Sequence, residues 1–435
     1  KLPMAAGRAP PSPVTMAPAT AGPCAPDAQP AGDLSAGELV FEQQMLRLNI
    51  RGEHFVEPVV AGPDGCVSSR FGLNVSNEFG LWKRSDLAHI GQSVRLTLVG
   101  HGANDATLEL LECEVANQLE STPAAQDGVF LGWDEAARLS CTLRVRAPSR
   151  PVLVQAEVVP QGARQVTGVC SLPIFPPACD VTVEDVRCIL RNAPEARQCR
   201  AVQGHPQLFV AEAPGHLGIG GKVWDAALAT IEWLNSAEDG SGGKGSRLER
   251  WVRGKHLLEL GSGTGVLALT LGTLSAPLSV TMTDLEDVVP LLELNLSLNR
   301  VVGCLQPQVR AADRSGGSEF RCAPLRWGDE EHVRRLLESG VPPDTLLLSD
   351  AVYDPACYAP LVESLVALCP PELHRRQRVL LVYRHRHCAD SFFSMMDQHF
   401  EVVLMPGLAG DGSTEGDSSM QDMQFFCCTR RTVPS

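Results

Sequence analysis

A glycine-rich turn between an apolar strand and an apolar helix is the feature that most limits how this chain can fold. The strand is expected at residues 256–260 and the helix at 266–272, with the turn Gly261-Ser262-Gly263-Thr264-Gly265 between them. Glycine lets the backbone approach a ligand that any Cβ would hold away, and the first turn of the helix offers free N–H groups. This order of strand, glycine turn and helix predicts an α/β sheet with a ligand beside the turn.

The spacing of these glycines separates two classes of ligand. A dinucleotide-binding turn has glycine at the sixth place of its motif, where this chain has Val266. A nicotinamide-dependent oxidoreductase is therefore disfavoured. The plainer alternative is a strand-to-helix turn that packs closely and binds nothing.

Seven apolar strands are expected in the carboxyl-terminal half of the chain, alternating with amphipathic helical segments as in a parallel α/β sheet. They are residues 256–260, 279–283, 321–325, 345–349, 378–383, 400–404 and 423–428. The last two strands are joined by a polar loop at 411–417 that has no room for a crossover helix. This final pair should therefore be antiparallel.

Composition divides the chain into three segments. Residues 1–35 are dominated by Pro, Ala and Gly, which bury too little apolar surface to offset chain entropy, so we expect disorder there. Residues 36–178 should form a β-rich accessory domain, and residues 179–435 should form the α/β domain. The accessory domain is predicted from short alternating apolar runs at 93–99, 107–113, 139–145 and 152–158.

Prolines mark the boundary between the last two segments. Pro173, Pro176 and Pro177 predict a hinge, because prolines at this density interrupt the hydrogen bonding of helix and sheet. A helix is expected directly after it, at residues 181–191.

Acidic and aromatic side chains gather around the expected ligand. Asp284 follows the second strand, where a carboxylate can accept hydrogen bonds from both hydroxyls of a ribose. Glu286 and Asp287 are rivals for that role, and all three acids could instead cap the next helix. Trp224 and Trp327 could stack on an adenine ring or belong to the apolar core.

The fourth strand ends in a second polar cluster. Asp350 could orient an incoming amine through a charge-assisted hydrogen bond, and Tyr353 could line the slot through which it enters. The alternative is that Asp350 and Asp354 cap the helix that begins near Cys357.

Charge and cysteine content restrict the partners. Acidic residues outnumber basic ones by 51 to 37, so the chain lacks the positive field that holds nucleic acid, and a protein substrate fits better. The 15 cysteines form no CxxC pair and should be reduced thiols, which favours the cytoplasm, with the nucleus as the alternative. No metal site is expected, because residues 384–388 match no familiar ligand spacing and should form a solvated rim for an acidic substrate. No apolar run has membrane-spanning length, and a monomer is expected.

Taken in order, the motifs resemble methyltransferase family 16, which includes the lysine methyltransferases of chaperones and translation elongation factors. The matching motifs are VWDAAL at 223–228, LELGSGTG at 258–265, TDLE at 283–286, LRWG at 325–328 and SDAVY at 349–353. The resemblance covers roughly half of the chain. It implies an α/β fold, a doubly wound seven-strand class I methyltransferase sheet with an antiparallel final hairpin, to which this chain adds the β-rich N-terminal domain.

The same resemblance implies S-adenosylmethionine as the cofactor. The residues that match the cofactor motifs are Trp224, Glu259, Gly261, Ser262, Gly263, Gly265, Asp284, Trp327 and Ser349. The DxxY motif of the family falls on Asp350 and Tyr353, where it is associated with placing the substrate lysine.

The leading hypothesis is therefore a protein-lysine N-methyltransferase. Methylation of a histidine or of a small molecule stays open, as does a non-catalytic adaptor, although intact glycines and an intact DxxY motif argue against an adaptor. Two departures from the family bear on the substrate. The fifth strand runs into Tyr383-Arg-His-Arg, where relatives often carry an acidic residue or lysine, and minimal members lack the β-rich domain.

Overall fold

The computed structural model describes residues 46–431 with a number of gaps. The gaps are 52–58, 77–89, 91–92, 101, 114–127, 135–137, 148, 161, 163–165, 178–182, 194–195, 203–204, 237–245, 303–304, 306–317, 339, 374–375, 386–388 and 408–422. Residues 1–35, for which disorder is expected, lie outside the described residues.

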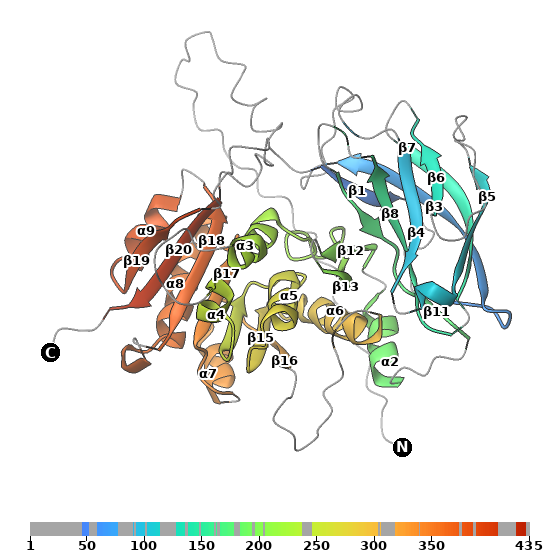
Figure 1. Ribbon diagram of the computed structural model, residues 1–435. Coiled ribbons are helices and arrows are strands. Elements are labelled where there is room, and N and C mark those ends of the chain that lie inside the picture. Colours follow the sequence, from blue (N-terminus) through green and yellow to red (C-terminus); the bar gives the residue numbers. More distant parts are fainter. Residues whose placement is uncertain are drawn as a thin grey trace, which may run out of the picture. The chain divides into compact units, whose positions relative to one another are not determined.

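The carboxyl-terminal half is built on a seven-stranded sheet in the order β16-β15-β14-β17-β18-β20-β19 (Figure 1). Its strands are β14 (His256–Leu260), β15 (Ser279–Asp284), β16 (Glu319–Pro324), β17 (Thr345–Ser349), β18 (Arg378–Arg384), β19 (Phe400–Met405) and β20 (Met423–Arg430). Neighbouring strands are parallel, except that β20 runs antiparallel to both β18 and β19. The seven predicted strands and the antiparallel final pair are confirmed.

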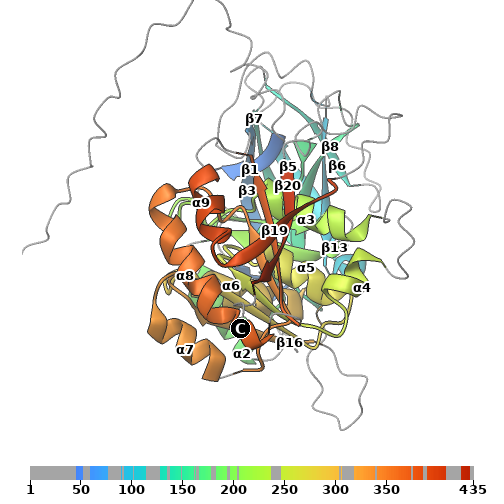
Figure 2. The ribbon, with the colours of Figure 1, turned by 90° about the vertical axis from the view of Figure 1, so that its left-hand side faces the viewer.

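Helices cover both faces of this sheet, because successive strand residues point to opposite sides. Leu257 packs with helices α3 (Asp225–Asn235) and α5 (Val266–Leu274), whereas the next residue, Leu258, packs with α8 (Tyr358–Leu368). Figure 2 shows α3, α4 and α5 on one side of the sheet and α7, α8 and α9 on the other. The bounds of the other three are Arg247–Trp251 for α4, Glu330–Glu338 for α7 and Asp390–Met396 for α9. In the described parts of the chain, no helix is long and apolar enough to cross a membrane.

The first half of the chain forms three further sheets, which we call the accessory sheets. One has the order β5-β7-β3-β1-β9, the second β13-β12-β10-β8-β4-β6, and the third pairs β11 with β2. Their strands are β1 (Leu46–Arg51), β2 (Val59–Val60), β3 (Cys66–Ser76), β4 (Ser93–Val99), β5 (Thr107–Cys113), β6 (Val129–Gly132), β7 (Arg138–Arg146), β8 (Leu153–Val159), β9 (Val166–Thr167), β10 (Val169–Cys170), β11 (Ile174–Phe175), β12 (Gln198–Val202) and β13 (His205–Glu212). The two larger sheets bury alternate residues in one apolar cluster, so they form a sandwich, and the expected β-rich region is present.

The six-stranded accessory sheet takes strands from both sides of the predicted boundary at residue 178. Strands β12 and β13 lie after that boundary, and β12 pairs with β10, which lies before it. The proline-rich segment is not the expected hinge, because Ile174 and Phe175 between its prolines are fully buried and pair with β2. The helix expected at 181–191 is α2 (Val183–Asn192), and residues 181–182 lie outside the described part.

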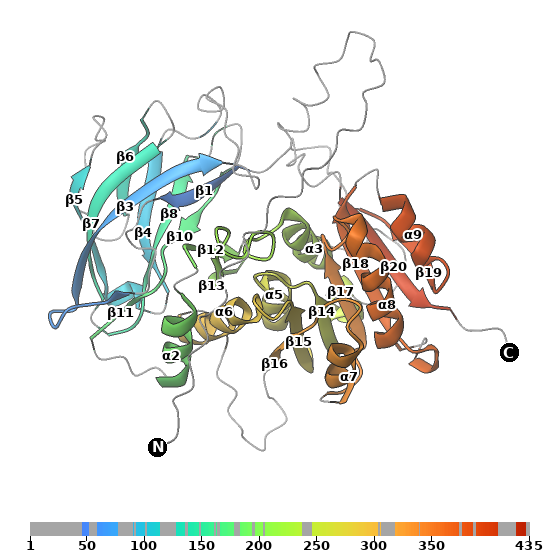
Figure 3. The ribbon, with the colours of Figure 1, turned by 180° about the vertical axis from the view of Figure 1, so that it is seen from behind.

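Helix α6 (Val289–Val301) closes the edge of this accessory sheet (Figure 3). Strand β13 is the outermost strand of this sheet. Two asparagines of α6, one helical turn apart, form hydrogen bonds with backbone groups on the outer edge of β13. Asn299 bonds to the N–H and carbonyl of Phe209, and Asn295 bonds to those of Ala211. Apolar residues of α2, α6 and the accessory sheets share one buried cluster, so the two halves are packed together and not merely tethered.

Candidate functional site

A cavity of about 560 Å³ lies at the carboxyl ends of β14, β15 and β17, where parallel α/β sheets bind ligands. Its volume falls within the range of small-molecule sites. The predicted site residues that line it are Trp224, Glu259, Gly261, Ser262, Gly263, Asp284, Trp327, Ser349 and Tyr353. Two predicted residues, Gly265 and Asp350, lie elsewhere and are described below.

The glycine turn fits this cavity only as glycine. Gly261 has a φ of +67°, and a Cβ there would lie 3.0 Å from Cζ2 of Trp327. Gly263 has a φ of +52°, and its Cβ would lie 3.1 Å from the carbonyl oxygen of Gly220. The turn therefore packs closely against Trp327 on one side and Gly220 on the other. Its backbone atoms line the cavity in place of side chains.

Gly265 performs a different task from the other two glycines. It caps the amino end of α5 in the left-handed conformation, with a φ of +75°. A Cβ there would lie 2.9 Å from Sδ of Met282 and 3.0 Å from Leu292, so this glycine allows the helix to pack closely on the sheet. Thr264 and Val266, its neighbours, line the cavity instead.

Asp284 lies at the end of β15 with its carboxylate directed at the glycine turn. Its Oδ2 accepts the N–H of Gly263 at 2.7 Å and its Oδ1 accepts the N–H of Leu285 at 2.7 Å. Burial nevertheless raises the pKa of Asp284 above its usual value. Helix α6 begins after Val288 without a side-chain cap, so Asp284 does not cap it. Of the two rivals, Asp287 also lines the cavity.

Two buried oxygens of the cavity wall have no hydrogen-bond partner within the described part of the chain, Oε2 of Glu259 and Oγ of Ser349. Glu259 is 2% exposed, and burial raises the pKa of its carboxyl group to about 8. An unpaired buried polar atom costs on the order of 1–3 kcal/mol, so both atoms suit a ligand that brings hydrogen-bond donors.

The two predicted tryptophans are half-buried and line the cavity, so neither is fully enclosed in the core. Trp224 donates its indole N–H to the carbonyl oxygen of Ile219 at 2.9 Å, which fixes the ring plane. Lys222 also lines the cavity and brings a positive side chain to it, a residue that the sequence analysis missed. Its position directly before the VWDAAL motif was the only available signal.

Asp350 lies just past β17 in a left-handed conformation with a φ of +53°, which is uncommon for any residue other than glycine. Its N–H donates to the carbonyl oxygen of Val382 at 2.8 Å, and its Oδ1 accepts the N–H of Arg384 at 3.5 Å. Asp354 caps the 3-10 turn Pro355–Cys357, since its Oδ1 accepts the N–H of Ala356 at 2.9 Å. The helix that was expected to be capped, α8, begins after Cys357 without a side-chain cap, so neither aspartate caps it. Asp350 is thus held by the neighbouring strand β18.

Tyr353 lines the cavity and stays a neutral phenol, because partial burial raises its pKa above the ordinary value. Of the segment expected to form a rim, only Arg384 and His385 are described, and residues 386–388 lie outside the described part. Among the residues that are described, no three His, Cys, Asp or Glu side chains are grouped as metal ligands would be.

The site lies within the part of the chain that is similar to known proteins. A family model described as lysine methyltransferase matches residues 203–399, which contain every residue of the cavity wall. The chain is 30% identical over 202 residues to EEF1A lysine methyltransferase 3 of Mus musculus, covering 46% of this chain and 72% of that protein. It is 30% identical over 213 residues to protein-lysine N-methyltransferase EFM6 of Saccharomyces cerevisiae, covering 46% and 77%. It is 29% identical over 189 residues to protein N-lysine methyltransferase METTL21A of Mus musculus, covering 43% and 71%.

Proposed function

The chain belongs to the lysine methyltransferase family, and from that premise we propose that it transfers a methyl group from S-adenosylmethionine to a lysine side chain of a protein. The observation that carries this proposal is the cavity beside the glycine turn, whose wall holds the unpaired oxygens of Glu259 and Ser349 within the described residues. Both oxygens belong to residues that line the cavity, where a bound ligand could satisfy them.

The residues of the cavity fit this cofactor group by group. S-adenosylmethionine supplies an electrophilic methyl group on a sulfonium sulfur, and it also carries an ammonium group, a carboxylate, a ribose and an adenine. We assign Glu259 and Ser349 to its hydrogen-bond donors, and Lys222 to its carboxylate. Asp284 has lone pairs left for the ribose hydroxyls after its two backbone bonds. Trp327, against the glycine turn, offers a flat face to the adenine.

The acceptor lysine is assigned to the end of β17. Asp350 orients the amine by accepting a hydrogen bond from it, and neutral Tyr353 lines the slot. The lysine Nζ must be unprotonated, because its lone pair forms the new C–N bond while the C–S bond breaks with its electron pair going to sulfur. The surplus proton then leaves the methylated nitrogen for solvent. These side chains contribute position and charge, and no covalent step.

We further propose that the protein acts as a monomer in the cytoplasm, with the nucleus as the alternative, and that it binds no nucleic acid. Burial raises the pKa of Cys170 to about 12 and that of Cys369 to about 12, so both remain inert thiols, as suits a reducing compartment. The net charge of -14 supports a protein substrate over nucleic acid.

Transfer of radiolabelled methyl groups from S-adenosylmethionine into whole-cell extract tests this proposal. We expect one or a few proteins to carry label on lysine. Gly263→Arg should abolish the labelling and the calorimetric binding of S-adenosylmethionine, because its Cβ would lie 3.1 Å from the carbonyl oxygen of Gly220 on a left-handed backbone, and the turn that lines the cavity would have to shift. Gly407→Arg is the control, because Gly407 has nothing within 4 Å of its Cβ position. Label on histidine would favour the alternative acceptor, and absence of both binding and labelling would favour an adaptor.

A further inference from the structure

We propose that Arg47, on strand β1 of the accessory sheets, is a positioning residue for the methyl-transfer site. It holds Asp225 and Val223 on either side of Trp224, and through Asp225 it fixes Arg384 beside Asp350. The inference rests on the proposed function and extends it, because it makes the accessory sheets a part of the enzyme's working machinery.

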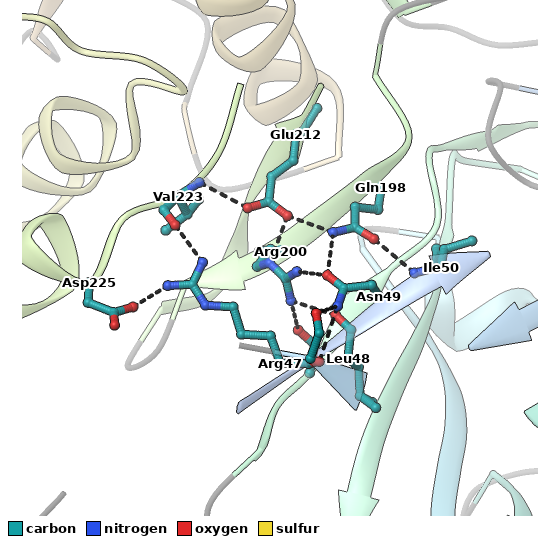
Figure 4. A network of polar contacts seen from close by, with 12 residues as sticks. Arg47, Leu48, Asn49, Ile50, Gln198, Arg200, Glu212, Val223 and Asp225 are labelled. Carbon is teal, nitrogen blue, oxygen red and sulfur yellow. Dashed lines mark hydrogen bonds and ion pairs between the residues drawn. The ribbon is translucent and has the colours of Figure 1, made fainter. Parts of the chain in front are cut away.

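The guanidinium of Arg47 forms hydrogen bonds with both sequence neighbours of Trp224, a residue that lines the cavity (Figure 4). It donates to the carbonyl oxygen of Val223 and to Oδ1 of Asp225. Arg47 is 3% exposed and Asp225 is 1% exposed, so water does not compete for these bonds. Trp224 lies between Val223 and Asp225 in the sequence, so these bonds restrain its backbone on both sides. A shift of the backbone at Trp224 would therefore break the buried ion pair between Arg47 and Asp225.

The other backbone group of Val223 is held by a second buried ion pair. Glu212 on β13 accepts the N–H of Val223 at 2.9 Å with Oε1, and its Oε2 accepts a bond from Arg200 at 2.8 Å. Arg200 in turn donates to the carbonyl oxygen of Leu48 on β1 at 2.8 Å. Both polar backbone groups of Val223 thus end on charged side chains of the accessory sheets, as Figure 4 shows.

Asp225 also binds Arg384, a residue that contacts Asp350, where the acceptor lysine is assigned. Its second oxygen, Oδ2, accepts a bond from Nη2 of Arg384 at 3.0 Å. Arg384 ends β18, its side chain is 17% exposed, and its N–H donates to Oδ1 of Asp350. One carboxylate therefore divides its two oxygens between the guanidinium of Arg47 and the guanidinium of Arg384, the residue whose backbone N–H bonds to Asp350.

The two halves of the molecule do not need these ion pairs in order to pack together. Leu153 and Phe175 of the accessory sheets already pack with Leu294 and Leu298 of α6 in a buried apolar cluster. A buried ion pair contributes less to stability than apolar packing of similar volume, since both charges must be desolvated. A role in positioning explains why these ion pairs hold the residues on both sides of Trp224 and the side chain of Arg384, whose backbone contacts Asp350.

The test compares Arg47→Met with Arg384→Met and with a control, Arg95→Met, in the full chain. Arg95 forms an ion pair with Glu157 on the accessory sheets, but the two side chains are 39% and 35% exposed and lie outside this network. The readouts are the Kd of S-adenosylmethionine, the thermal midpoint, and kcat and KM with the extract protein that the wild type labels. We expect Arg47→Met and Arg384→Met to lower kcat/KM for that protein about tenfold or more, with Arg95→Met within about twofold.

A double variant and a conservative variant separate positioning from folding. If both arginines act through Asp225, Arg47→Met with Arg384→Met together should lower kcat/KM no more than about twofold beyond the worse single variant. Arg47→Lys keeps a charge for Asp225 but cannot also reach the Val223 carbonyl with a planar fork, so it should recover part of the loss. It also keeps the test open if Arg47→Met does not fold.

Two results would overturn the role of Arg47. One is a lowered thermal midpoint with unchanged kcat and KM below the unfolding transition, which marks a purely structural tie. The other is a double variant whose losses multiply, which marks independent actions. A wild type that binds S-adenosylmethionine but labels no protein would refute the proposed function, and with it this role, whereas an active wild type with an equally active Arg47→Met refutes this role alone.

Discussion

Asn295 donates a hydrogen bond from Nδ2 to the carbonyl oxygen of Thr264 at 2.8 Å, which ties helix α6 to the glycine turn. The same amide group donates to the carbonyl oxygen of Ala211 on the accessory sheets at 3.1 Å. One side chain therefore joins the edge of the accessory sheets to the turn that faces the cavity. Asn299, one helical turn later, makes the matching pair of bonds to Phe209 but lies beyond the reach of the turn.

This difference makes Asn299 a control for Asn295. Asn295→Leu and Asn299→Leu each leave two backbone groups of β13 without partners, so each should lower the free energy of unfolding by about 2–5 kcal/mol. Only Asn295→Leu also releases the glycine turn, and it should raise the Kd of S-adenosylmethionine about tenfold. Denaturant unfolding and calorimetry measure the two effects. Equal Kd values for the two variants would show that the bond to Thr264 does not shape the cavity.

Gly261→Ala should weaken cofactor binding, because its Cβ would lie 3.0 Å from the Trp327 ring and displace it. The left-handed backbone alone costs an alanine about 1–2 kcal/mol of stability. Gly254→Ala has that cost without the clash, since its φ is +62° and nothing lies within 4 Å of its Cβ position. We expect similar thermal midpoints for the two variants, with a Kd for S-adenosylmethionine raised about tenfold or more in Gly261→Ala alone. A normal Kd in that variant would place Trp327 outside the binding surface.

The seven-stranded sheet was predictable because parallel strands are buried on both faces and read as continuous apolar runs. Leu346, Leu347 and Leu348 of β17 are all nearly or fully buried, and a run of this kind stands out in the sequence. Strands β12 and β13 were missed for the opposite reason. They carry Arg200 and Glu212, which resemble loop residues in the sequence and are buried only because they pair with each other.

The site was predictable where its residues directly follow strands. Asp284 and the glycine turn adjoin β15 and β14, so sequence position alone placed them at the sheet edge. Arg47 lies 178 residues before Asp225, and no local pattern links an alternating strand residue to a helix so far along the chain. Contacts of that separation follow from the packing of the two halves.

Glu259 should make cofactor binding depend on pH. Burial raises the pKa of its carboxyl group to about 8, so it is largely neutral at pH 7 and becomes a better acceptor for an ammonium group as it ionises. The affinity for S-adenosylmethionine should therefore rise from about pH 6 to 8, and then fall as the α-amino group of the cofactor, with a pKa near 8, loses its proton. Glu259→Gln should remove the rising limb in calorimetric titrations. A rising limb that persists in this variant would assign it to another group.

The same carboxyl group should act on stability in the opposite direction. Its folded-state pKa lies above the ordinary value of 4.5, so the free protein gains stability from Glu259 below that pH and loses it as the pH rises toward about 8. Denaturant unfolding of the cofactor-free protein at pH 5 and pH 8 measures the loss. Glu259→Gln should reduce the difference between the two pH values, and an unchanged difference would show that Glu259 ionises normally in the folded state.

Asp350→Asn should separate acceptor placement from cofactor binding. Asparagine tolerates the left-handed backbone, with a φ of +53°, so the fold should persist, whereas alanine would add strain. The amide lacks the charge that orients an amine, so kcat/KM for the labelled protein should fall about a hundredfold, while the Kd of S-adenosylmethionine stays within about threefold. Asp354→Asn is the control, since that carboxylate caps the turn at Ala356 and asparagine caps equally well. Parallel losses of affinity and turnover in Asp350→Asn would instead assign Asp350 to the cofactor pocket.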